Sequence, residues 1–101
     1  MTDQAFSAAA RVPTAAGSRY LQQLSKHWAH KFPVNFTPEK SRIELPSGLC
    51  EMAAEEEALL VSIESASAEE RDRLKDVVEK HIVRFAFRED LVFDWRNVTA
   101  A

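Results

Sequence analysis

Apolar and polar residues alternate over several short stretches of this chain, which is the pattern of half-buried β-strands. The first such stretch runs from Ala5 to Val12 and ends at Pro13. The clearest alternation lies between Ala58 and Glu64, where every second residue is apolar. Further strands are predicted at 34–36, 42–45, 49–54 and 91–96.

Two longer stretches follow the helical period of 3.6 residues instead. Gly17-Ser18 offers an N-cap for a helix that runs to about Lys31 and is stopped by Pro33. Its inward stripe consists of Leu21, Leu24 and Trp28. The segment 67–70 reads Ser-Ala-Glu-Glu, a capping box that predicts a second helix behind it. The apolar stripe of this second helix is Leu74, Val77, Val78, Ile82 and Phe85.

The predicted order of elements is therefore β-α-β-β-β-β-α-β, within one domain that spans residues 1–101. Several consecutive strands between two helices are typical of an α+β domain. We expect a single-layer antiparallel sheet of four to six strands with both helices packed on one face. The other face is expected to be mostly polar and to meet water or a polar partner. Its predicted side chains are Arg42, Glu44, Glu51, Ser62, Glu64, Asp94 and Arg96.

Charge and composition limit the classes of function. The formal net charge of -3 does not favour nucleic acid or an anionic membrane as a partner. The charge is uneven, since residues 1–38 carry four Lys or Arg and one acid, against nine and fifteen in the remainder. The single cysteine, Cys50, favours a reducing cytoplasm. No secretory signal or membrane-length apolar run is present, so a cytoplasmic protein is expected.

The segment Lys26-His27-Trp28-Ala29-His30-Lys31 concentrates the most chemistry, with two of the three histidines. On a helix, His27 and His30 would share a face. Three hypotheses remain open. The histidines are structural, or they form half of a zinc or iron site, or they belong to a site for a small anion. The anion-site residues would be Arg19, Lys26, His27, His30 and Lys31.

Two further residues could complete a metal site with His27 and His30, namely His81 and Cys50. Each also has a structural interpretation, His81 as a buried imidazole with a backbone partner and Cys50 as a small core residue. At the end of the second helix, Arg84 and Arg88 are candidates for holding an acidic ligand. Arg88 is alternatively expected to form an ion pair with Glu89 or Asp90.

Several motifs together resemble a bacterial family of unknown function, domain of unknown function 2218. They are the segment 26–31, Gly48-Leu49-Cys50, the run 81–89 and Trp95. The resemblance implies a small bacterial α+β domain without established activity or catalytic residues. Some members of this family look to be linked to siderophore-interacting or ferric-reductase-like proteins, which hints at a connection to iron acquisition.

The leading functional hypothesis is a non-enzymatic accessory protein that binds a small anionic ligand or a protein partner, with a link to iron or siderophore handling. No nucleophile, base and orienting group form a recognisable set. The first alternative is a small metal-dependent or acid-base enzyme that uses His27, His30 and His81. The second alternative is a self-association module that forms a homodimer through its open sheet face or a sheet edge.

Overall fold

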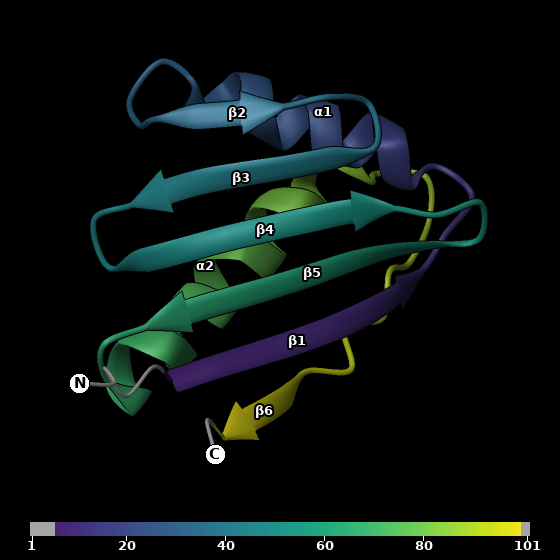
Figure 1. Ribbon diagram of the computed structural model, residues 1–101. Helices are drawn as coiled ribbons and strands as arrows, with labels where there is room; N and C mark the ends of the chain where they lie inside the picture. Colours follow the sequence, from purple (N-terminus) through teal and green to yellow (C-terminus); the bar gives the residue numbers. More distant parts are fainter. Residues whose placement is uncertain (1–5, 100–101) are drawn as a thin grey trace.

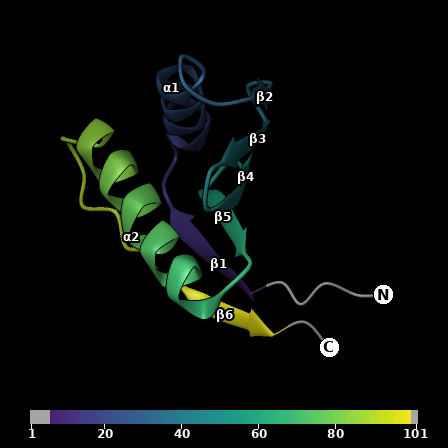
Figure 2. The same ribbon diagram turned by 90° about the vertical axis from the view of Figure 1, so that its left-hand side faces the viewer.

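The computed structural model describes residues 6–99 and has the predicted element order. Two helices lie on one face of a sheet, and the other face is open (Figures 1 and 2). The elements are β1 (Phe6–Pro13), α1 (Gly17–Trp28), β2 (Val34–Phe36), β3 (Lys40–Leu45), β4 (Gly48–Ala54), β5 (Ala58–Ser65), α2 (Ala68–Phe85) and β6 (Arg96–Thr99).

The six strands are arranged in the order β2-β3-β4-β5-β1-β6, and every neighbouring pair is antiparallel. Three of these pairs join strands that follow one another along the chain, and these strands need only short connections. β1 instead pairs with β5 on one side and with β6 on the other, so the first strand lies inside the sheet. Both helices pack over the same face of this sheet (Figure 2).

Alternation decides which side chains reach the core, as predicted. Ala8, Ala10 and Val12 of β1 are buried, and so are Leu59, Val61 and Ile63 of β5. Cys50 and Met52 of β4 are also buried, opposite α1 and α2. The predicted first residue of β1, Ala5, lies outside the described residues.

The predicted boundaries of α1 are wrong at both ends. The helix begins at Gly17 with Ala16 as N-cap and without a side-chain cap. The Ser18 hydroxyl is used elsewhere, because it donates to the Pro38 carbonyl at 2.6 Å. The helix ends at Trp28, whose carbonyl accepts the backbone N–H groups of Lys31 and Phe32 in a tight turn. His30 and Lys31 therefore lie beyond the helix, and Pro33 does not end it.

The capping box before α2 is confirmed at its first bond, since the Ser67 hydroxyl accepts the Glu70 N–H at 3.1 Å. Such a bond satisfies one of the N–H groups that the first helical turn leaves without a partner. Leu74, Val78 and Ile82 of the predicted stripe are fully buried against the sheet.

The last strand was predicted at 91–96, but the structure places it at Arg96–Thr99. Leu91, Phe93 and Trp95 do alternate as half-buried residues, but they pack against the core from an extended segment that is not part of the sheet. Trp95 donates its indole N–H to Glu79 of α2 at 2.9 Å. The segment thus runs back along α2, and strand pairing begins only at Arg96, against the start of β1 (Figure 2).

No helix within residues 6–99 is long and apolar enough to cross a membrane.

Candidate functional site

The two helices bring His27 and His81 together. Their ring centroids lie 5.6 Å apart, and the His81 ring lies 4.9 Å from that of Trp28. His81 is half-buried, and its Nδ1 lies 2.7 Å from the Val77 carbonyl oxygen. Because a carbonyl oxygen can only accept, Nδ1 carries the proton in this bond. The backbone partner agrees with the structural interpretation of His81.

The other proposed metal ligands do not join this pair. His30 is exposed in the turn after α1, and Cys50 is fully buried in β4. Burial raises the pKa of the Cys50 thiol to about 12, which disfavours the thiolate that a metal needs. Within residues 6–99, no group of three or more His, Cys, Asp or Glu side chains could hold a metal ion. Zinc normally has at least three protein ligands, so two imidazoles make an incomplete site.

The seven residues proposed for an anionic ligand lie on separate surfaces. Arg19 and Lys26 line a shallow depression of about 620 Å³ on the outer side of α1. His27 turns toward α2, whereas His30 and Lys31 are exposed beyond the end of α1. The remaining two, Arg84 and Arg88, are exposed at the end of α2 and after it. The structure therefore does not form one anion site from this set.

A junction that the sequence did not predict joins the loop after α2 to the start of α1. The Thr14 hydroxyl donates to both carboxylate oxygens of Glu89 at 3.1 Å, and the Tyr20 hydroxyl donates to Oε2. Burial and the neighbouring Glu89 carboxylate both raise the pKa of Tyr20. Glu89 is thus held by two hydroxyl groups, and the Arg88 guanidinium lies over the Phe87 ring instead of forming the expected ion pair.

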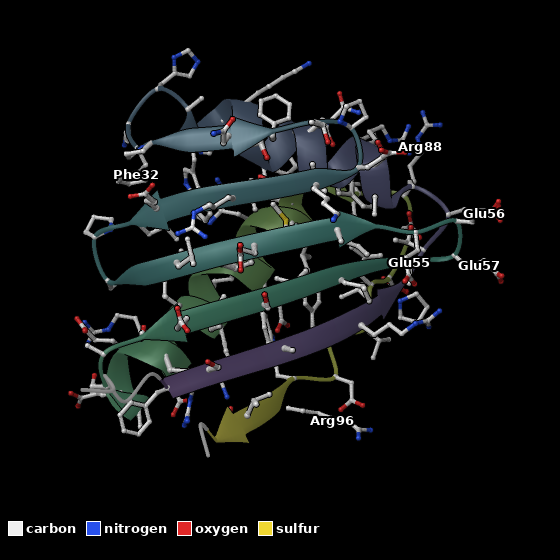
Figure 3. The ribbon with its side chains drawn as sticks, in the orientation of Figure 1. Phe32, Glu55, Glu56, Glu57, Arg88 and Arg96 are labelled. Carbon is white, nitrogen blue, oxygen red and sulfur yellow. The ribbon has the colours of Figure 1, made fainter. Side chains whose placement is uncertain are left out.

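A second concave region, larger than the depression on α1, lies on the open face of the sheet. A groove of about 1120 Å³ crosses the strands on this face. Figure 3 looks onto the open face, with Arg96 at its lower border. The β-strand register arranges the outward side chains in rows across the sheet, because directly paired residues point to the same side.

Three rows follow from the observed register. The basic row consists of Lys40, Ala53, Leu60 and Arg11. The central row consists of Asn35, Arg42, Glu51, Ser62, Ala9 and Arg96. The acidic row consists of Glu44, Leu49, Glu64, Ser7 and Val98. The groove covers the basic and central rows and reaches only Val98 of the acidic row.

The floor of the groove is apolar and its rim is charged. Ala53 and Leu60 are half-buried in the floor between the exposed cations Arg11 and Lys40, and Ala9 of the central row is half-buried beside them. Neither of these two cations has an ion-pair partner among the side chains of the described residues. The groove therefore offers two free positive charges beside an apolar surface.

The remaining charges of the groove lie in pairs. Arg42 contacts Glu51 at 3.2 Å, and Arg96 contacts Asp94 at 3.3 Å. These pairs are exposed, so they contribute little to stability. They do leave Glu51 and Asp94 neutralised by a neighbouring guanidinium.

The prediction of a mostly polar open face needs correction at this floor. Its charged and hydroxyl members lie where expected, but the directly paired Leu60 and Ala53, together with Ala9, add apolar surface. A signal was present in the sequence. Leu60 and Ala53 are apolar residues at positions where their strands' alternation calls for polar ones. Only the register shows that they are direct neighbours.

Comparison with known proteins now identifies the family. Residues 9–96 match the family described as "Uncharacterized protein conserved in bacteria (DUF2218)". The chain belongs to the DUF2218 family. This DUF2218 chain is also similar to a solved structure described as "NMR structure of PA4090 from Pseudomonas aeruginosa". The two chains are 33% identical with a TM-score of 0.77, over 90% of this chain and 95% of the other. No curated protein matches this DUF2218 chain.

Proposed function

We propose that this protein is a non-enzymatic binding domain whose open sheet face takes a small anionic ligand with an apolar body. The observation that carries the proposal is the groove with its apolar floor between Arg11 and Lys40. An apolar body would lie on Ala53 and Leu60, and an acidic group would reach the cations of the basic row. Ligand sites commonly combine such a mainly apolar surface with a few well-placed polar groups.

The chemistry of the lining supports binding rather than catalysis. Its side chains include neither histidine nor cysteine. Its two carboxylates, Glu51 and Asp94, each form an ion pair with an arginine and are thus already engaged. The groove thus has groups that recognise an acid but lacks a nucleophile with an adjacent base.

The connection to iron acquisition that the family resemblance implies suggests a specific candidate for this proposal. A ferric siderophore of the catecholate type combines aromatic rings with negative charge, which is the combination that the groove would recognise. Anionic groups would contact Arg11 and Lys40, and a ring would cover Leu60. A siderophore is one anionic ligand among others of this chemistry, and the experiment below separates it from the general class.

The test is a titration with anilinonaphthalene sulfonate, a flat apolar probe with one anionic group, followed by its fluorescence. We expect saturable binding to the wild type. Leu60→Asp should weaken it by about tenfold or more, because a carboxylate then occupies the apolar floor. Lys26→Ala, in the depression on α1, is the matched control and should bind like the wild type.

A ferric catecholate chelate, followed by quenching of tryptophan fluorescence, forms the second arm of the experiment. Competition between the chelate and the probe would support a siderophore. Probe binding without chelate binding would leave the general class and remove the siderophore. Equal probe binding by the wild type and Leu60→Asp would contradict the groove as the site.

A further inference from the structure

The charges of the open face have a polarity along the strands. The basic row has Lys40 and Arg11, and the acidic row on the other side of the central row has Glu44 and Glu64. Lys40 and Glu44 lie on the same strand, four residues apart, which separates them by about 13 Å. One outer row of the face is therefore basic and the other is acidic, while the exposed turn beyond the basic row carries Glu55, Glu56 and Glu57.

We infer that a second copy of this chain covers the groove when no ligand is bound, with its acidic row against the basic row of the first copy. This inference rests on the proposed function, since it concerns the occupant of the same site. A two-fold axis along the central row turns the partner face over and reverses its strand direction. Each strand then lies opposite its own equivalent, as a closed isologous dimer requires.

In the two outer rows this arrangement pairs opposite charges. In the central row the axis places Arg42, Glu51 and Arg96 opposite their own equivalents, and these like charges weaken the association. Lys40 lies opposite Glu44 of the partner subunit, because both residues belong to β3. Arg11 on β1 lies one strand away from Glu64 of the partner subunit, a lateral distance of about 4.8 Å that a long guanidinium side chain spans. The two-fold axis repeats each contact, so four ion pairs form between the copies.

The apolar residues agree with the same arrangement. Leu49, between the two acids of the acidic row, would lie opposite Ala53 in the floor of the groove. An apolar side chain between two carboxylates repeats the chemistry that the proposed function assigns to the ligand. The partner's acidic row would therefore occupy the groove as the ligand does, and the two occupants would exclude one another.

The area of the open face limits how much surface such a dimer can bury. Five spacings between strands of about 4.8 Å give a width of about 24 Å. Across the three rows and their flanks the length is about 20 Å, so roughly 1000 Å² would be buried in total. That area is at the lower limit for a specific interface, and the dimer should be weak and reversible. Ion pairs at its rim should make it weaker at high salt.

Charge-reversal variants analysed by sedimentation equilibrium test the inference. Lys40→Glu and Glu44→Lys each place like charges opposite one another, so each should weaken the dimer by about tenfold or more. An equimolar mixture of the two variants should restore dimers, because both contacts of the mixed pair then join opposite charges. The mixture also serves as the control for folding, since unfolded variants could not restore an interface.

Lys80→Glu, which changes an exposed lysine on α2, is the matched control and should leave the dimer unchanged. The anilinonaphthalene probe should convert wild-type dimers into monomers. A wild type that stays monomeric at every concentration would overturn the inference, and so would a mixture no more associated than its components. Either result leaves probe binding, and hence the proposed function, to be judged by Leu60→Asp. Dimers with the expected charge dependence but without probe binding would instead refute the proposed function.

Discussion

The junction at Glu89 gives the sharpest test of what holds the C-terminal segment in place. Two buried hydroxyl groups, those of Thr14 and Tyr20, donate to one carboxylate that is 69 residues away from Tyr20 in the chain. Tyr20 is 2% exposed and Thr14 is 7% exposed, so water cannot readily replace a lost acceptor. We predict that Glu89→Ala destabilises the protein more than Tyr20→Phe does.

The expected magnitudes follow from what each change leaves behind. Tyr20→Phe removes one hydrogen bond to a charged group, worth about 1.5–3 kcal/mol. Glu89 is exposed and can turn to water, so the cost of Tyr20→Phe should lie near the lower value. Glu89→Ala leaves two buried hydroxyls without their acceptor, at about 1–3 kcal/mol for each group. The Thr14 oxygen still accepts the Ala16 N–H, and a total of about 2–4 kcal/mol is therefore expected.

The same junction predicts a pH dependence. Burial and Glu89 raise the pKa of Tyr20, so its neutral form is favoured in the folded state. The stability that this provides is fully present below the unfolded-state pKa of about 10 and is lost as the pH rises toward the folded-state pKa. Because Tyr20 is the only tyrosine in the chain, the phenolate absorbance reports on it alone.

Urea unfolding of the wild type, Tyr20→Phe, Glu89→Ala and the double variant measures the free energies of unfolding. A double-mutant cycle should give a coupling between Tyr20 and Glu89 of about 1 kcal/mol or more. Glu56→Ala is the control, since Glu56 lies in the exposed turn at the same end of the molecule (Figure 3). Additive effects, or a Tyr20 titration midpoint that Glu89→Gln does not lower, would refute the reasoning.

Three further predictions concern single contacts. Cys50, with its pKa raised to about 12, should react with a thiol reagent only as fast as the protein unfolds, and a fast reaction of the native protein would contradict its burial. Gly48→Ala should cost about 2 kcal/mol or more in urea unfolding, because its Cβ would collide with the Glu64 carbonyl; a loss below 0.5 kcal/mol, about that of an ordinary surface change, would disprove the collision. Trp95→Phe should cost about 1 kcal/mol by losing the bond to Glu79, and an equal loss in a Glu79→Ala background would show that the bond contributes nothing.

Local patterns sufficed for the elements whose stabilisation is local. Alternation correctly identified β5, and Ser67 marked the start of α2, because both signals depend on residues that are close in sequence. The end of α1 was not predictable in this way. Its helical period continues past Trp28, and what stops the helix is a turn that feeds β2.

The C-terminal segment shows the limit of a periodic pattern. Leu91, Phe93 and Trp95 alternate just as a strand would, and the alternation does report their burial correctly. Whether such a segment pairs with a sheet depends on the edge available to it. Trp95 is bound to α2, and only the first four residues of β1 pair with β6.

The candidate site separates the two kinds of information most clearly. By itself, the sequence determined the α+β class, the element order and the buried face of most strands, because these follow from the period of the apolar residues. Its motifs also carried the resemblance to the family. Only the tertiary structure shows that the residues of segment 26–31 lie in different surroundings. His27 contacts α2, whereas His30 and Lys31 lie in an exposed turn. The tertiary structure also decided that Leu60, Ala53, Arg11 and Lys40 become neighbours. Strand register joins Arg11 to Leu60, which lie 49 positions apart, and no local pattern records that register.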